Sequence, residues 1–102
     1  MERFRIFTTN SFEKRYQKLP TREQAWIQKV KENLEEFPTG KILRFYWLRE
    51  KKFENKRVYY LLDEEKKIIL LVAYGSKKEQ QEIIDQIIEK KKEWLDYLRT
   101  LG

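Results

Sequence analysis

Residues 56–75, Lys-Arg-Val-Tyr-Tyr-Leu-Leu-Asp-Glu-Glu-Lys-Lys-Ile-Ile-Leu-Leu-Val-Ala-Tyr-Gly, decide the fold of this chain. Two runs rich in branched and aromatic residues, 57–62 and 67–74, flank the polar segment 63–66, and this pattern predicts a β-hairpin. Gly75 is expected to end the second strand. A further extended run at 42–47 predicts a strand ahead of the hairpin.

Helices are predicted on both sides of this strand-rich segment. Asn10 and Glu13 have the spacing of a helix-capping pair, and they predict a short helix that Pro20 ends. Thr21 and Gln24 repeat that spacing and predict a longer helix, which stops at the Pro-Thr-Gly segment that follows residue 37. Because the link between them is so short, the two helices are expected to be antiparallel neighbours.

A third capping pair, Ser76 and Glu79, precedes Ile and Leu residues at helical spacing and predicts one long C-terminal helix. Alternating polar and apolar residues at 3–6 add a short N-terminal strand. The predicted order is β-α-α-β-β-β-α. This order describes an α+β fold, a mainly antiparallel sheet packed against a helical hairpin, in one domain that spans residues 1–102.

The composition excludes several classes of function. The 102 residues include no cysteine and no histidine, which excludes disulfides, thiolate metal sites and a Ser-His-Asp triad. We expect neither a metal nor another cofactor. The longest apolar run, Ile68 to Tyr74, is too short to span a membrane, and no signal-peptide core follows the N-terminus, so a cytoplasmic protein is expected.

The excess positive charge is concentrated in one segment. The whole chain carries +6, and residues 41–60 alone hold seven basic and two acidic residues, a net charge of +5. Six aromatic residues are interspersed among these charged residues. Cations beside aromatic rings are typical of single-stranded RNA binding, and a solvated sheet face is the alternative explanation.

The start of the C-terminal helix is a second basic feature. Lys77 and Lys78 fall in its first turn, where cations oppose the helix dipole at a cost of about 0.3–1 kcal/mol each. Such a helix start favours a bound anion. Because it follows the strand next to the one that begins at Arg57, the two basic groups are interpreted as one phosphate site.

The order of elements and several short strings resemble the RelE/ParE toxin superfamily of toxin–antitoxin pairs. The strings are Phe12-Glu13-Lys14, Lys18-Leu19-Pro20, Leu48-Arg49-Glu50-Lys51-Lys52, Lys56-Arg57-Val58-Tyr59-Tyr60 and Lys77-Lys78-Glu79-Gln80. The resemblance implies a type II toxin, a ribosome-dependent mRNA endoribonuclease of the RelE-like branch. It also implies two partners, a cognate antitoxin and mRNA in the ribosomal A site. The alternatives are a ParE-like topoisomerase inhibitor and a catalytically silent RNA-binding relative.

The resemblance also assigns residues. The arginine of the family's Tyr-Arg-x-x-Tyr strand matches Arg57, and the basic residue after the last strand matches Lys78. The family's lysines on the preceding strand correspond loosely to Arg49, Lys51 and Lys52. The tyrosine in the C-terminal segment of RelE-like enzymes falls on an isoleucine, Ile84, so its role is empty or moved.

The chemistry available without histidine is attack of a ribose 2′-OH on the adjacent phosphate. Arg57 and Lys78 are predicted to stabilise the charge that develops on the phosphate oxygens. The general base stays open: Lys51 or Lys52 is one answer, and Glu50 is the rival. The RNA-binding residues predicted alongside them are Arg44, Lys56, Lys77, Tyr60 and Tyr74, although the two tyrosines are also explained as core rings.

Overall fold

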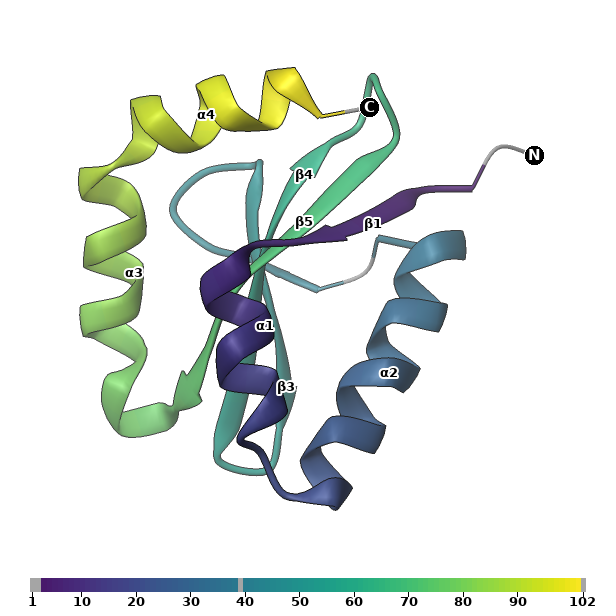
Figure 1. Cartoon of the computed structure of the whole chain (residues 1–102). Coiled ribbons are helices and arrows are strands. Elements are labelled where there is room, and N and C mark those ends of the chain that lie inside the picture. Colours follow the sequence, from purple (N-terminus) through teal and green to yellow (C-terminus); the bar gives the residue numbers. More distant parts are fainter. Residues whose placement is uncertain (1–2, 39, 102) are drawn as a thin grey trace.

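The computed structural model describes residues 3–38 and 40–101, and Figure 1 shows a central twisted sheet with helices around it. The elements in chain order are β1 Arg5–Thr8, α1 Asn10–Gln17, α2 Thr21–Glu36, β2 Lys41–Ile42, β3 Leu48–Phe53, β4 Lys56–Asp63, β5 Ile68–Ser76, a 3₁₀ turn Lys77–Glu79, α3 Gln80–Glu89 and α4 Lys91–Thr100. Within the described ranges, no helix combines the length and the apolar character that crossing a bilayer requires.

The five strands form one sheet in the order β1-β5-β4-β3-β2, and only the β1–β5 pair is parallel. The predicted α+β class and the predicted hairpin are therefore confirmed, with β4 and β5 as its two strands. β4 is the middle strand, and its residues 57–62 are all buried. A strand covered on both faces explains why residues 58–62 are hydrophobic or aromatic without alternation.

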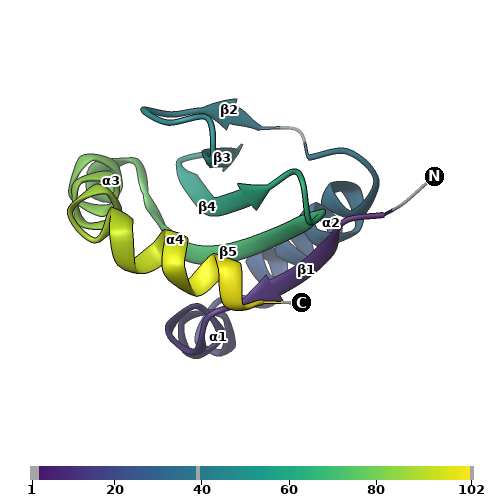
Figure 2. The ribbon, with the colours of Figure 1, turned by 90° about the horizontal axis from the view of Figure 1, so that it is seen from above.

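Two apolar cores lie on opposite faces of the sheet. Phe12 of α1 and Ile27, Val30 and Leu34 of α2 pack with Tyr60 and other residues of one face. Ile87 of α3 and Leu98 of α4 pack with Tyr59, Leu61 and Leu70 of the other face. Figure 2 shows α3 and α4 bordering the sheet along a side different from that of α2. The helical hairpin and the C-terminal helices thus cover one face each.

The predicted strand at 42–47 is wrong. β2 ends at Ile42, residues 43–47 form an irregular connection, and the longer strand β3 begins at Leu48. The aromatic residues that suggested a strand have a different role, because the rings of Phe45 and Trp47 stack on each other with centroids 5.2 Å apart. The charged residues that follow form the strand instead, because they pair in register with β4.

Two of the three predicted helix caps are also wrong. Thr9 caps α1 by accepting a hydrogen bond from the backbone N–H of Phe12, so Asn10 is the first helical residue and not the cap. Pro20 occupies the cap position of α2 without a side-chain bond. Gln24 instead donates to the backbone carbonyl of Tyr16, a contact that joins the two helices. The helices run in opposite directions, as expected (Figure 1).

The C-terminal segment is divided into two helices, so the prediction of one long helix is wrong. The capping box of Ser76 and Glu79 is confirmed, and it starts a 3₁₀ turn that leads into α3. At Lys90 the backbone leaves the helical region (φ −102°, ψ 25°), and α4 turns sharply away from α3 (Figure 1). This turn brings Trp94 and Leu98 against the sheet, where a straight helix would carry them away from it.

Gly75 does not end β5, which continues through it to Ser76. Gly75 instead has a packing role. A Cβ atom at this position would lie 2.5 Å from Cδ1 of Ile83 and 3.2 Å from Oε1 of Glu79. Gly75 therefore allows α3 to lie directly against the end of β5.

The substitution Gly75→Ala should lower the free energy of unfolding by about 1–3 kcal/mol, because the new methyl group overpacks this contact. Urea denaturation would measure the loss. Ile83→Val removes the Cδ1 atom that the methyl meets, so the double variant should be more stable than the sum of the two single effects predicts. Additive effects would show that Gly75 does not set this approach.

The capping box also predicts a pH dependence of stability. The backbone N–H and the hydroxyl of Ser76 donate to Glu79, at 2.9 and 3.1 Å, and these bonds lower the pKa of Glu79 below its usual 4.5. A carboxyl whose pKa is lower in the folded state stabilises the fold above about pH 4.5 and loses that effect as the pH falls through the folded value.

The stability difference between wild type and Glu79→Gln should therefore be present at pH 7 and shrink steadily in acid, as measured by urea denaturation across pH. The control is Glu65→Gln, at an exposed turn residue. A wild-type advantage that is constant down to pH 2 would contradict the role of the ionised carboxylate.

Candidate functional site: a basic pocket at the edge of the sheet

The strand register brings most of the predicted catalytic residues to one pocket. Lys52 lies opposite Arg57, and Glu50 lies opposite Tyr59. Opposite residues and residues two apart share a face of a sheet, so all four lie on the face that α3 covers. A cavity of about 460 Å³ opens there, which we call the Arg57 pocket. Its lining residues are Gly40, Lys41, Glu50, Lys51, Lys52, Arg57 and Gln80.

Arg57 is the most informative residue of this pocket. Its side chain is only 6 % exposed, and its Nε and Nη1 atoms are buried without a hydrogen-bond partner. Among the described residues, no carboxylate forms an ion pair with it. A buried, unpaired guanidinium is costly, and it is prepared to bind an anion in the bidentate geometry that phosphates accept.

Tyr59 adds a second buried donor on the same face. Its hydroxyl is fully enclosed and has no partner among the described residues. Burial, followed by the charge of Glu50, raises the pKa of Tyr59 to about 12, although Arg57 acts in the opposite direction. The phenol therefore stays protonated at neutral pH and remains a hydrogen-bond donor beside the guanidinium.

Glu50 is the carboxylate of the Arg57 pocket, and it is 6 % exposed. Its Oε2 atom accepts a hydrogen bond of 2.9 Å from Nε2 of Gln80, the first residue of α3. The start of the C-terminal helices therefore contributes directly to the pocket. Lys52 is exposed at the mouth, and Lys51 is half-buried.

The second predicted basic group lies at a neighbouring place and not in the Arg57 pocket. Lys77 and Lys78 are exposed on the 3₁₀ turn, where they line a separate cavity of about 580 Å³ with Asn55 and Ser76. Lys56 pairs with Ser76 in the register of β4 and β5. Since Arg57 pairs with Gly75 in the same ladder, the two basic groups lie at the same end of the hairpin. The strand ends are neighbours, as the sequence argument expects, but the two groups line separate cavities and not the single phosphate site that was predicted.

Two predicted arginines lie elsewhere. Arg49 faces the other side of the sheet, where it donates to the backbone carbonyls of Pro38 at 2.8 Å and Tyr46 at 3.3 Å. Its guanidinium also lies 4.7 Å from the centroid of the Tyr46 ring. Arg44 belongs to the connection that precedes β3, whereas Lys52 and Arg57 pair near the end of that strand. The structure brings neither arginine into the Arg57 pocket.

The two predicted RNA-binding tyrosines are core residues. Tyr60 is fully buried, and its hydroxyl donates to the carbonyl of Pro38 at 3.2 Å. Tyr74 is 5 % exposed, and its hydroxyl donates to Glu23 at 2.6 Å. Burial raises the pKa of both phenols, to about 12 for Tyr60. In this arrangement a base cannot stack on either ring. The position of the family's missing tyrosine, Ile84, likewise lies in an apolar core.

Three contributors to this site were not singled out from the sequence. Lys41 and Gln80 line the Arg57 pocket, and Tyr59 lies beside its arginine. Because residues two apart on a strand share a face, the sequence could have placed Tyr59 beside Arg57. The position directly after a capping box was also a signal for Gln80. Lys41 was counted in the basic segment 41–60 but not assigned to the site, because only the pairing of β2 with β3 places it opposite Glu50.

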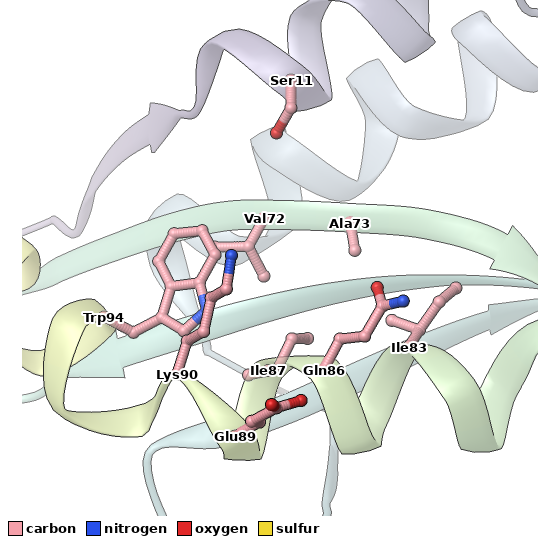
Figure 3. A pocket seen from close by; sticks show the side chains of 9 residues that line it. All are labelled: Ser11, Val72, Ala73, Ile83, Gln86, Ile87, Glu89, Lys90 and Trp94. Atoms are coloured by element: carbon pink, nitrogen blue, oxygen red, sulfur yellow. The ribbon is translucent and has the colours of Figure 1, made fainter.

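A second cavity of about 460 Å³ has a different character (Figure 3). Val72 and Ala73 of β5 form its floor, and Ile83, Ile87 and Trp94 of the C-terminal helices form one wall. It is mainly apolar, and Lys90 is its only basic lining residue in the described part of the chain. Within that part, no cluster of three or more potential metal ligands occurs either.

Comparison with known proteins relates this geometry to a fold. No sequence profile of a known family matches the chain, and no curated protein matches it. Solved structures do match. A mutant Escherichia coli toxin RelE in the free state aligns with a TM-score of 0.73 and 18 % identity, over 88 % of this chain and 98 % of that one.

Two toxin–antitoxin complexes also match. The intact E. coli RelBE complex aligns with a TM-score of 0.65 and 17 % identity, over 72 % of this chain and 95 % of the matched chain. The RelBE2 complex from Mycobacterium tuberculosis aligns with a TM-score of 0.65 and 21 % identity, over 74 % and 93 %. At these identities the similarity concerns the backbone, and on that basis the chain has the fold of the RelE toxins.

Proposed function

We propose that this chain is the toxin of a type II toxin–antitoxin pair and acts as a ribosome-dependent mRNA endoribonuclease in the cytoplasm. The observation that carries the proposal is the buried guanidinium of Arg57, which has no partner in the described chain and lies in a pocket lined by three lysines. The RelE-like fold supports it, because the matching structures include complexes of a toxin with its antitoxin.

The reaction is attack of a ribose 2′-OH on the adjacent phosphate. The P–O5′ bond breaks, and the products are a 2′,3′-cyclic phosphate and a free 5′-OH. Arg57 binds the non-bridging oxygens, where negative charge accumulates in the transition state. Lys41, Lys51 and Lys52 add positive charge around them.

The neighbouring basic group binds the RNA backbone on one side of the cut. Lys56, Lys77 and Lys78 lie at the same end of the hairpin as Arg57, so one strand can contact both groups. Phosphate contacts of this kind position the strand without reading its sequence. The chain has no histidine, so dependence on the ribosome is expected, because the ribosome holds the mRNA in a reactive geometry.

A catalytically silent RNA-binding protein is the second candidate. The burial of Tyr60 and Tyr74 favours it, because neither ring is available to stack on a base. Both candidates need the Arg57 pocket for binding, and they differ in whether the bound RNA is cut.

Arg57→Ala should reduce cleavage of mRNA on programmed ribosomes by about 10²- to 10³-fold, since it removes a donor to the transition-state charge. Primer extension would map and quantify the cuts. Arg5→Ala removes the same charge from β1, at the opposite edge of the sheet, and should cut like wild type. Equal cleavage by all three proteins would refute the proposed role of Arg57, and bound but intact mRNA with wild type would identify the silent binder.

Stability provides an independent test of the same residue. Arg57→Met replaces a buried, unpaired charge with an apolar side chain of similar length, so the free energy of unfolding should rise by about 1–3 kcal/mol. Urea denaturation of the isolated protein would measure it. A loss of stability would indicate that Arg57 has a structural partner and is not held ready for a ligand.

A further inference from the structure

Glu50 is positioned as a proton acceptor in the Arg57 pocket. It shares the strand face of Arg57 and Lys52, and it is the carboxylate among the lining residues. Its side chain is 94 % buried, yet it forms no ion pair with a described residue. A buried carboxylate whose partner is a neutral amide retains an oxygen that can accept a proton from a ligand.

The lysines of the pocket suit a different task. Lys41 and Lys52 are exposed cations, and at neutral pH a lysine must first lose its proton to act as a base. A lysine that enters the reaction protonated can instead stabilise charge on the phosphate or donate its proton to a leaving group. Between Lys52 and Glu50, the carboxylate is therefore the better candidate for the role of base.

We propose that Glu50 is the general base of the cleavage reaction and that Gln80 is its positioning residue. This inference rests on the proposed function. Glu50 takes the proton from the 2′-OH while the 2′-oxygen bonds to phosphorus. The P–O5′ bond breaks, and the leaving 5′-oxygen takes a proton from the ammonium group of Lys52. Exchange with solvent restores both side chains.

Gln80 fixes the geometry of the base. Its amide holds Oε2 of Glu50 at 2.9 Å, which leaves Oε1 to accept the proton of the substrate. A hydrogen bond to the ionised form also favours the carboxylate over the carboxylic acid. The capping box at Ser76 and the close approach at Gly75 place Gln80 at the end of β5, so packing sets the position of this amide.

The test compares two identical substitutions at adjacent positions. Gln80→Leu removes the amide that bonds Glu50. Gln81→Leu is the matched control, since Gln81 is exposed and donates to Asp85 instead. Single-turnover cleavage on programmed ribosomes is measured across pH, together with affinity for the ribosome. Glu50→Gln is measured in the same way.

Gln80→Leu should slow cleavage about tenfold at neutral pH with unchanged ribosome affinity, and the acid limb of its pH profile should move to higher pH. Glu50→Gln should lose about 10²- to 10⁴-fold, the usual contribution of a general base. Gln81→Leu should match wild type. Urea denaturation of each variant confirms that the fold is retained.

Carbon-13 NMR of the Glu50 carboxyl group in the isolated protein adds a readout that does not need activity. The charged and titratable neighbours of this carboxyl are Lys41, Lys51, Lys52, Arg57 and Tyr59. They are the same in both glutamine variants. The carboxyl chemical shift of Glu50 should therefore differ between Gln80→Leu and wild type, whereas Gln81→Leu should match wild type.

The outcomes separate this inference from the proposed function. If wild type cuts mRNA and Glu50→Gln cuts equally well, the base is another group and the nuclease assignment stands. If Gln80→Leu is slow but neither its pH profile nor the carboxyl NMR signal of Glu50 changes, Gln80 has only a structural role and its positioning role is refuted. If wild type does not cut, the proposed function fails, and the role of Glu50 as base fails with it.

Discussion

The rest of this structure depends on the guanidinium of Arg57, in which two nitrogens are buried without a partner among the described residues. It lies in a pocket that Gln80, the first residue of α3, also lines. Such a group opposes folding, so the surrounding elements must stabilise it. The buried stretch 57–62 of β4 holds the side chain, β3 places Lys52 opposite it, and Gln80 of α3 bonds Glu50 in the same pocket. The apolar cores on both faces of the sheet offset the cost of keeping this cation ready for a ligand.

The fold was largely predictable because its middle is locally encoded. Residues 57–62 and 67–74 form the central hairpin almost where the sequence places it, and Ser76 with Glu79 starts the C-terminal helices. The errors lie where tertiary contacts override local preference. The aromatic residues at 43–47 stack in a connection, and β3 is recognisable as a strand only through its pairing with β4. The turn at Lys90 depends on how α4 packs against the sheet.

The candidate site was predictable in part, for a related reason. The basic residues and their place near the end of the hairpin could be predicted from the sequence. The structure brings Arg57, Lys52 and Lys51 together in one pocket. Which face each residue occupies depends on strand bounds that were misplaced by several residues. Arg49 was therefore grouped with side chains on the opposite face, and Tyr59 was passed over for Tyr60. The place of Gln80 in the site could not be predicted, because it depends on a contact with Glu50, 30 residues earlier in the chain.

The parallel pairing of β1 with β5 has a consequence for synthesis of the chain. Arg5 pairs with Ile68 and Thr8 with Leu71, so β1 cannot pair with β5 until residues 68–71 have been synthesised. Contacts between such distant segments form late and slow folding, because a long loop must close first. The amide of Gln80 leaves the ribosome later still. A nascent chain therefore emerges without the assembled pocket, and the site is completed only after Gln80 has left the ribosome.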